Sequence, residues 1–248
     1  MTKADHYRTT LRSLDHWDAF LLKESGLPGP RGNLELAQVV ADEGDAELFD
    51  RYLCYDAAQA PTNSPYEFLA FCGVVGLGRL LAAGQTEQLA RLRVCASDPR
   101  WRIREGVAMA LQRLGDQDMD ALLKAMEDWS KGNLLEQRAA AAALCEPRLL
   151  HDPKQVRRVL KILGRITTSI NQVRDRKSEG FQALRKGLGY CWSVAIAAAP
   201  AEGQRALEKW FTTDDRDIRW IVRENLKKTR LQRMDAAWVK SARARLEV

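Results

Sequence analysis

The sequence predicts an all-α fold, an α-solenoid of stacked antiparallel helical pairs, and three observations lead to this prediction. Apolar residues recur at helical spacing along almost the whole chain, and the alternation typical of strands is missing. The pattern D-x-R-W-x-[IV]-R-E occurs twice, at 98–105 and at 217–224. Small residues cluster inside the expected helices at 139–143 and 187–189, where they allow neighbouring helices to approach closely. Repeated helical units of this kind bury their apolar faces by stacking on their neighbours.

At the N-terminus, the apolar spacing predicts one helix over about 5–24, with Leu11, Leu14 and Trp17 on its apolar face. The segment 26–32 contains two prolines and three glycines, so it should interrupt regular structure. Asn33 can cap the next helix, through Val40, because its side chain can accept a hydrogen bond from a free backbone N–H.

Five helical pairs and a closing helix are expected after this segment. Ser64-Pro65, Asp98-Pro99 and Asp152-Pro153 mark three of the helix starts, since proline fits the first helical turn, where its missing N–H would be unpaired. The expected pairs are 45–58 with 65–82, 85–96 with 99–114, 117–130 with 134–147, 153–173 with 179–199, and 201–212 with 217–231, followed by 234–246. We interpret 1–248 as one domain, with repeats over 43–231 between terminal caps at 1–42 and 232–248.

The duplicated pattern resembles HEAT-type helical repeats, which typically place an aspartate near a turn and a Val/Ile-Arg dipeptide at the start of the second helix. Asp98 with Ile103-Arg104, and Asp217 with Val222-Arg223, fit both elements. The middle repeats depart from the pattern, because Gly132 stands at the aspartate position and Gln137 at the Val/Ile position. The resemblance covers roughly 43–231. It implies that these aspartates and arginines bond across neighbouring repeats as a structural ladder.

The charge of the chain is divided unevenly between its two halves. The whole sequence of 248 residues has a formal net charge of +6, but residues 1–150 sum to −5 and residues 151–248 sum to +11. A basic C-terminal half favours an anionic partner. The alternative is a set of solvated helix faces with neutralising ion pairs.

Composition also indicates the cellular compartment and the class of protein. Apolar residues make up 46% of the chain, which is enough for a sizeable core. The first residues have no apolar signal region and no run approaches the ~18 apolar residues of a membrane helix, so a cytoplasmic protein without a membrane partner is expected. The five cysteines lie in helical apolar patterns without a C-x-x-C pair, which is typical of reduced, buried thiols: Cys54, Cys72, Cys95, Cys145 and Cys191.

No constellation of catalytic residues stands out. The three histidines, at 6, 16 and 151, are not at a metal-ligand spacing, and no C-x-x-C pair or H-E-x-x-H motif occurs. A G-x-S-x-G elbow and a phosphate-binding glycine loop are also missing. These observations favour a non-enzymatic protein over an enzyme, with no cofactor, no metal and no catalytic residue assigned.

Aromatic and charged residues of the two motifs are the candidate binding residues. Trp101 and Trp220 each precede a glutamate by four residues, which places ring and carboxylate on one helix face. Such a group beside arginines could hold a flat or cationic ligand, whereas the alternative is a half-buried ring at a repeat junction. The glycines of 187–192 also allow a small-molecule pocket near Tyr190, Trp192 and Trp220, with close packing as the alternative. The full candidate set is Trp101, Arg102, Glu105, Arg185, Lys186, Tyr190, Arg219, Trp220, Glu224 and Lys227.

The chain is also similar in size and charge to the HEAT-like DNA alkylation repair glycosylases, solenoids that grip DNA on a basic concave face. That family commonly uses a W-D-x-x-D-type motif. Here Trp17-Asp18 is followed by Leu21 where the second acid belongs, and Trp210 has Asp214 four residues on without an adjacent aspartate. The resemblance therefore extends to the architecture and the basic half, and not convincingly to the motif.

Two functional hypotheses follow. The first is a non-enzymatic scaffold that recognises a protein or peptide partner through its concave face. The alternative is a nucleic-acid-binding protein related to the DNA alkylation repair glycosylases. Nucleic acid is favoured if the five cations of the candidate set, at 102, 185, 186, 219 and 227, converge on one concave face. A face of mixed charge favours a protein partner.

Overall fold

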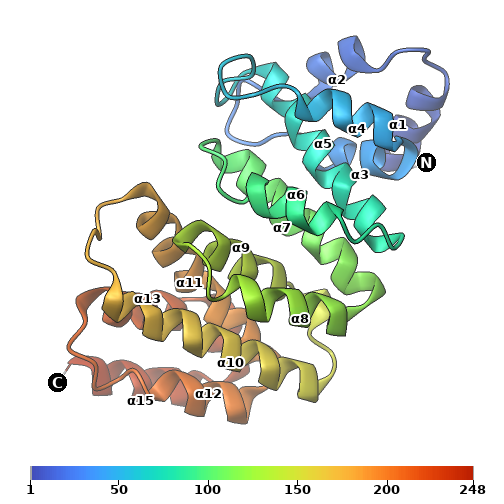
Figure 1. Ribbon diagram of the computed structural model, residues 1–248. Helices are drawn as coiled ribbons and strands as arrows, with labels where there is room; N and C mark the ends of the chain where they lie inside the picture. Colours follow the sequence, from blue (N-terminus) through green and yellow to red (C-terminus); the bar gives the residue numbers. More distant parts are fainter. Residues whose placement is uncertain (1, 248) are drawn as a thin grey trace. The chain divides into compact units, whose positions relative to one another are not determined.

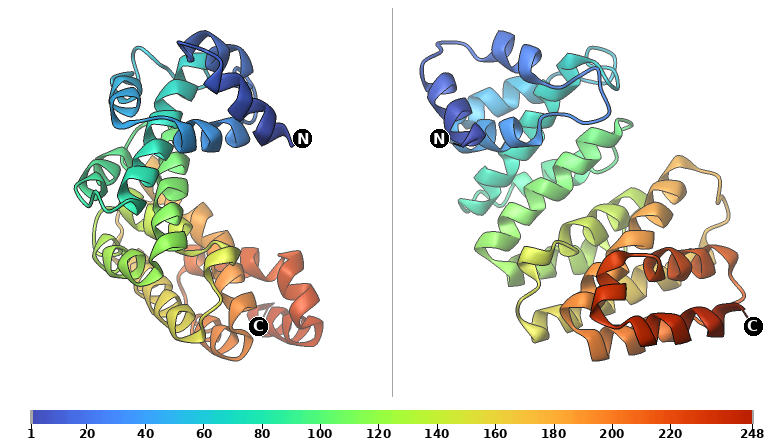
Figure 2. Two further views of the ribbon diagram at one scale, coloured as in Figure 1. Left: turned by 90° about the vertical axis from the view of Figure 1, so that its right-hand side faces the viewer. Right: turned by 180° about the vertical axis from the view of Figure 1, so that it is seen from behind.

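A computed structural model describes residues 2–247 and confirms the all-α prediction. The described residues form fifteen α-helices and two short 3-10 helices, with no strand among them. The helices can be followed along the colour gradient in Figure 1 and from two further sides in Figure 2. By internal contacts the chain divides into two compact units, residues 1–117 and 118–248. The expected division of one domain into caps and repeats stays a prediction.

The first unit is built around one long buried helix, α5. This helix packs against α2, α3, α4, α6 and α7, so a single core holds the unit together. The helices of the unit are α1 Lys3–Arg12, α2 Asp18–Glu24, α3 Leu34–Glu43, α4 Ala46–Leu53, α5 Pro65–Ala82, α6 Gln88–Cys95 and α7 Trp101–Gln117. As predicted, Asn33 caps α3 by accepting the Leu36 N–H, and Ser64 caps α5 with Pro65 in its first turn.

The apolar sequence of helix α5 is explained by its burial in the core of the first unit. Phe68 to Leu77 are almost fully buried, and a Cβ added at Gly78 would lie 2.4 Å from the Cα of Ala110 on α7. Glycine therefore permits a very close approach of the α5 and α7 backbones. Contrary to the sequence expectation, the helix is long and apolar enough to cross a membrane. Since 78% of that window is buried inside the protein, it also fits the core helix of a folded unit.

The expected single helix over 5–24 is wrong, because the chain breaks between α1 and α2. The indole N–H of Trp17 donates to the Leu11 carbonyl at 2.9 Å, which folds the connection back onto the end of α1. Asp18, at the start of α2, accepts hydrogen bonds from Arg51 and from the Tyr52 hydroxyl of α4 at 2.6 and 2.7 Å. These partners lie more than thirty residues along the chain. Local periodicity carries no information about them.

The second unit stacks its helices in two layers. Contacts link α8, α10 and α12 in one layer and α9, α11 and α13 in the other, and α11 packs against both of its neighbours within its layer. The α-helices are α8 Met119–Trp129, α9 Leu134–Leu144, α10 Pro153–Ser169, α11 Glu179–Ala198, α12 Pro200–Glu208, α13 Arg216–Leu226, α14 Thr229–Met234 and α15 Ala236–Glu247. The 3-10 helices are Pro147–Leu149 and Ile170–Gln172. The predicted pairs α8 with α9 and α10 with α11 are in contact, whereas α12 and α13 each pack chiefly against α11 and not as a pair. Helix α14 is an additional short helix.

A buried amide joins the two central helices of this unit. Asn225 of α13 is fully buried, accepts the Ser193 backbone N–H at 2.8 Å and donates to the Leu188 carbonyl at 2.8 Å. Both partners belong to α11. Because an unpaired buried amide is costly, these bonds fix the register of α13 against α11. They hold the neighbouring surface residues of the two helices in a defined arrangement.

Candidate functional site

The two copies of the sequence motif begin their helices at different points. Helix α7 starts at Trp101, three residues after Asp98, whereas α13 starts at Arg216 and is capped by Asp215. Trp101 is therefore the first residue of its helix and Trp220 the fifth. Although the two tryptophans occupy the same motif position, their indoles lie in different environments. Each stacks against an arginine, but Trp101 meets its chain neighbour Arg102 and Trp220 meets Arg185 from another helix.

Arg102 lies inside the first unit. Its guanidinium donates to the Glu67 carboxylate at 3.0 Å, to the Gly29 carbonyl at 2.7 Å and to the Asn63 side-chain oxygen at 3.2 Å. The Glu67 side chain is fully buried and that of Arg102 is 6% exposed. Arg102 thus ties the loop after α2 to α5 and α7. It does not contribute to an exposed binding surface, whereas its neighbour Trp101 is 42% exposed. Glu105, one turn along α7, is half-buried.

At the first motif, Asp98 contacts an arginine of the motif itself. The Asp98 carboxylate binds the guanidinium of Arg100 at 2.8 and 2.9 Å. Arg100 also donates to the carbonyls of Tyr55 and Ala60 and so holds the loop after α4. Arg104 donates to the backbone carbonyls of Asp98 and Pro99. The motif here ends a loop and starts a helix.

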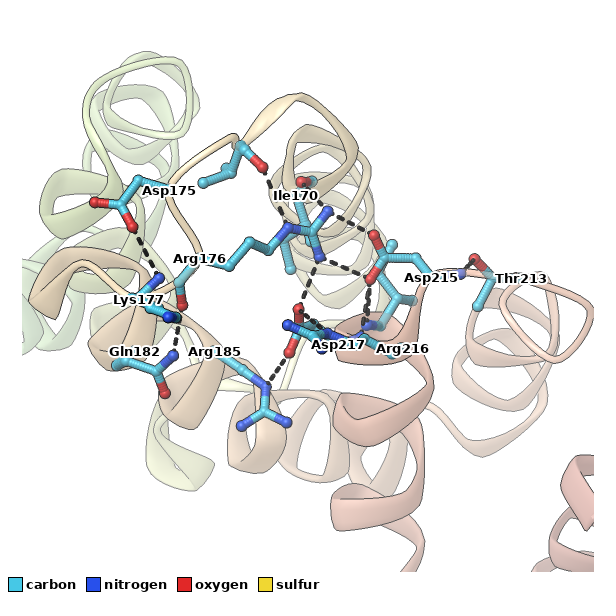
Figure 3. A network of polar contacts seen from close by, with 12 residues as sticks. Ile170, Asp175, Arg176, Lys177, Gln182, Arg185, Thr213, Asp215, Arg216 and Asp217 are labelled. Carbon is cyan, nitrogen blue, oxygen red and sulfur yellow. Dashed lines mark hydrogen bonds and ion pairs between the residues drawn. The ribbon is translucent and has the colours of Figure 1, made fainter.

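At the second motif a network reaches the neighbouring helical pair (Figure 3). Arg176, in the loop before α11, lies 2.6 Å from an Asp215 oxygen and 2.9 Å from an Asp217 oxygen. Arg185 of α11 places its Nε 2.8 Å from the other Asp217 oxygen. The aspartate therefore bridges between pairs as the resemblance implied. Its partners are Arg176 and Arg185, while Arg223 donates to the Leu246 carbonyl at 3.1 Å.

The network also sets the charge state of Asp215. Hydrogen bonds from Arg176 lower the pKa of Asp215, and backbone N–H groups of α13 add to this effect against the opposing influence of burial. Hydrogen bonds to Asp215 in turn raise the pKa of Arg176. Both groups are thus held in their charged forms. Asp215 was not among the candidate residues, although its position just before an apolar helical run marks it as a helix cap.

Six candidate residues lie on two packed helices of the second unit, and a seventh, Lys227, directly follows the second helix. Trp220 packs over Gly189 of α11, where an added Cβ would come within 3.0 Å of the indole, and the Arg185 guanidinium stacks 3.7 Å from the ring centroid. Close packing therefore explains Gly189. We name the surface formed by these residues the α11–α13 face: Arg185, Lys186 and Tyr190 of α11, Arg219, Trp220 and Glu224 of α13, and Lys227, the residue that ends α13.

Tyr190 is the exposed aromatic of the α11–α13 face. Its ring is 45% exposed, and the Arg230 guanidinium lies 4.8 Å from the ring centroid and donates to its hydroxyl at 2.5 Å. The Lys228 ammonium lies 6.0 Å from the same ring. Trp192, by contrast, is buried and donates its indole N–H to Thr167. The pocket expected between Tyr190, Trp192 and Trp220 is therefore not formed by these described residues.

The five cations chosen to separate the two hypotheses do not form one unneutralised stripe. Arg102 is buried in the first unit, and Arg185 is paired with Asp217. Arg219 of α13 donates to the Leu246 carbonyl at 3.0 Å, and Lys227, just after α13, lies 2.5 Å from a Glu224 oxygen. Lys186 is exposed on α11. The α11–α13 face thus contains aromatic rings, cations and a carboxylate.

The packing defines the chain as a helical repeat protein, and one solved structure supports this definition. AlkD2 from Streptococcus mutans superposes with a TM-score of 0.61 at 21% identity, over 85% of this chain and 96% of that chain. The similarity shows the fold, as expected from the distant resemblance to the DNA alkylation repair proteins. A designed armadillo repeat protein covers 84% of this chain and 98% of its own, at 15% identity and a TM-score of 0.31 that is too low for a structural argument. No family model matches the sequence, and no curated protein matches it significantly.

Proposed function

We propose that the protein is a non-enzymatic binding scaffold of the cytoplasm whose α11–α13 face recognises an acidic segment of a protein partner. The mixed character of that face carries the proposal. Tyr190 offers exposed aromatic surface between cations, and most of the candidate cations already have a partner inside the chain. A peptide can use the ring as an anchor and place carboxylates near the surrounding cations. Regular neutralisation of successive phosphates needs several cations along one surface.

The positive charge of the C-terminal half favours a negatively charged partner. Residues 151–248 have a net charge of +11, which attracts an anionic segment over distances comparable to the Debye length. Lys186 is exposed on the α11–α13 face, and Lys228 and Arg230, at the start of α14, flank Tyr190 beside it. Binding should therefore weaken as the salt concentration rises, although burial of the Tyr190 ring should retain part of the affinity.

Nucleic acid is the second candidate partner, and two observations favour it. The fold resembles that of AlkD2, and the basic half supplies the charge that a phosphate backbone requires. On this hypothesis affinity would depend on many cations of the second unit and little on Tyr190. Salt would then abolish binding almost completely.

Fluorescence polarisation with three labelled probes tests the proposal: a short Asp/Glu-rich peptide with one phenylalanine, the same peptide with lysines for the acids, and random duplex DNA. The acidic peptide should bind best, and Tyr190→Ala should weaken it by about tenfold, as for an anchor aromatic. Tyr66→Ala is the matched control, because Tyr66 is equally exposed at 45% but belongs to the first unit. Duplex binding without peptide binding would instead establish the nucleic-acid hypothesis.

A further inference from the structure

A hollow lies in the second unit on the layer of α8, α10 and α12, apart from the α11–α13 face. It has a volume of about 460 Å³, is open to solvent and runs between α10 and α12. Its α10 residues span Arg157 to Thr168, which is three helical turns or roughly 17 Å. Trp210 and Leu160 supply apolar lining. The dimensions are those of a groove that holds a short helical segment.

Gly164 opens the middle of this groove. It lies inside α10, where glycine disfavours the helix, yet an added Cβ would meet no atom within 4 Å. Packing within the chain therefore does not require glycine at this position, in contrast to Gly78. The neighbouring Thr168 hydroxyl donates to the Gly164 carbonyl at 2.9 Å, so its polar group is already satisfied. The floor can accept an apolar side chain without leaving a hydrogen-bonding group unpaired.

Cations surround the apolar floor. Arg157, Lys161 and Lys209 line the groove, and the single acid among the lining residues, Glu202, lies 3.6 Å from the Arg157 guanidinium. The Lys161 and Lys209 side chains are exposed at the groove. An occupant must therefore combine an apolar face with acidic flanks. An amphipathic helix with carboxylates beside its apolar stripe has this arrangement.

We infer that the α10–α12 groove is a second binding site, which takes an acidic amphipathic helix of a partner protein. Its apolar stripe lies over Gly164 and Trp210, and its carboxylates lie near Lys161 and Lys209. The site is distinct from the α11–α13 face, because its lining comes mainly from α10 and from α12 with the residues just after it, and none of its lining residues belongs to that face. The buried Trp192 is the lining residue that α11 contributes. Each site can therefore fail its own test without affecting the other.

The test uses the full chain and a labelled helical peptide with leucines on one face and glutamates on both flanks. Gly164→Leu should fill the groove and weaken binding of this peptide at least about tenfold, the loss expected of a blocked anchor pocket. The melting temperature should not fall, because there is open space at position 164. The matched control is Ala197→Leu, which adds the same kind of side chain at an exposed position of α11. Lys161→Glu with Lys209→Glu should weaken binding without filling the groove.

Three results would overturn the inference. The first is equal binding by the wild type and by Gly164→Leu. The second is equal binding of a scrambled peptide with the same composition, since that would remove the requirement for an apolar face. The third is equal binding of a lysine-flanked version. Self-association of the wild type that Gly164→Leu abolishes would likewise reject a partner helix and assign the groove to a second copy of the chain.

Discussion

At the residue scale, the sequence marks charged residues as candidates for binding but does not show which group each one contacts. Arg102 and Arg219 were both candidates for binding a partner, and both use their guanidinium groups inside the chain. What decides the role of Arg102 is Glu67, thirty-five residues earlier. A motif shows which residue types are adjacent along the chain, and it cannot show which distant acid each cation will meet. Tyr190 and Lys186, whose exposure follows from their places on α11, were predictable from helical periodicity.

Removal of the Arg102 side chain should destabilise the first unit. Arg102→Ala leaves the buried Glu67 carboxylate without its cation, and breaking a buried ion pair from one side costs about 3–5 kcal/mol. Urea denaturation measures the change in the free energy of unfolding. Arg31→Ala, at an exposed loop position, is the control and should change it by less than about 0.5 kcal/mol. If Arg102→Ala proves as stable as the control, the ion pair between Arg102 and Glu67 does not stabilise the first unit.

Asp215 should make stability depend on pH. Its pKa in the folded protein is lowered by Arg176, so its contribution to stability is complete above its unfolded pKa, near 3.8. The contribution is lost as the pH falls through the lower pKa of the folded state. Asp215→Asn should therefore cost about 1–2 kcal/mol at pH 7 and progressively less in acid, since asparagine keeps the helix cap but not the charge.

The control for this pH dependence is Asp152→Asn. Asp152 caps α10 by accepting the Lys154 N–H, and asparagine can perform the same role. Unfolding free energies of both variants are compared with the wild type from pH 7 to pH 2, so that the range extends well below the unfolded pKa of aspartate. A constant deficit of Asp215→Asn across this range would show that charge is not the basis of its effect.

At the element scale, most helices were predictable because their signals are local. The caps Asn33, Ser64 and Asp152, together with the apolar periodicity, located α3, α5 and α10 close to their observed starts. The break between α1 and α2 was missed because its hydrogen-bond partners on α4 are distant in sequence. The equal spacing of the two motifs was also misleading. Helix α13 is capped by Asp215, which lies outside the shared pattern. Equivalent motif residues therefore occupy different positions along their two helices.

Two mid-helix glycines should respond in opposite directions to alanine. Gly164→Ala should raise the free energy of unfolding by about 0.5–1 kcal/mol, because α10 gains helix propensity and the new methyl group meets no neighbour. Gly78→Ala should lower it by about 1–3 kcal/mol, because the methyl group would overlap the Ala110 backbone. Thermal or urea unfolding measures both variants in parallel. If both variants changed the free energy of unfolding in the same direction, either the close packing of α5 against α7 or the open space at Gly164 of α10 would be contradicted.

At the scale of the whole molecule, the distribution of charge and the distribution of contacts are related but not identical. The sequence becomes basic after residue 150, whereas the contacts divide the chain at residue 117. The second unit therefore includes the acidic segment of α8 as well as the basic helices that follow. Composition could predict that the two halves differ in charge. It could not predict the boundary between compact units, because that boundary depends on which helices share a core.

Hydrogen exchange of two variants tests whether the units are also cooperative units of unfolding. Each unit has its own core, around α5 in the first and α11 in the second. Arg102→Ala should therefore speed amide exchange mainly within residues 1–117, and Asp215→Asn mainly within residues 118–248, since local stability follows the contacts that each variant removes. Mass spectrometry of peptic fragments locates the change. Faster exchange along the entire chain in both variants would instead mean that 1–248 unfolds as the single domain the sequence suggested.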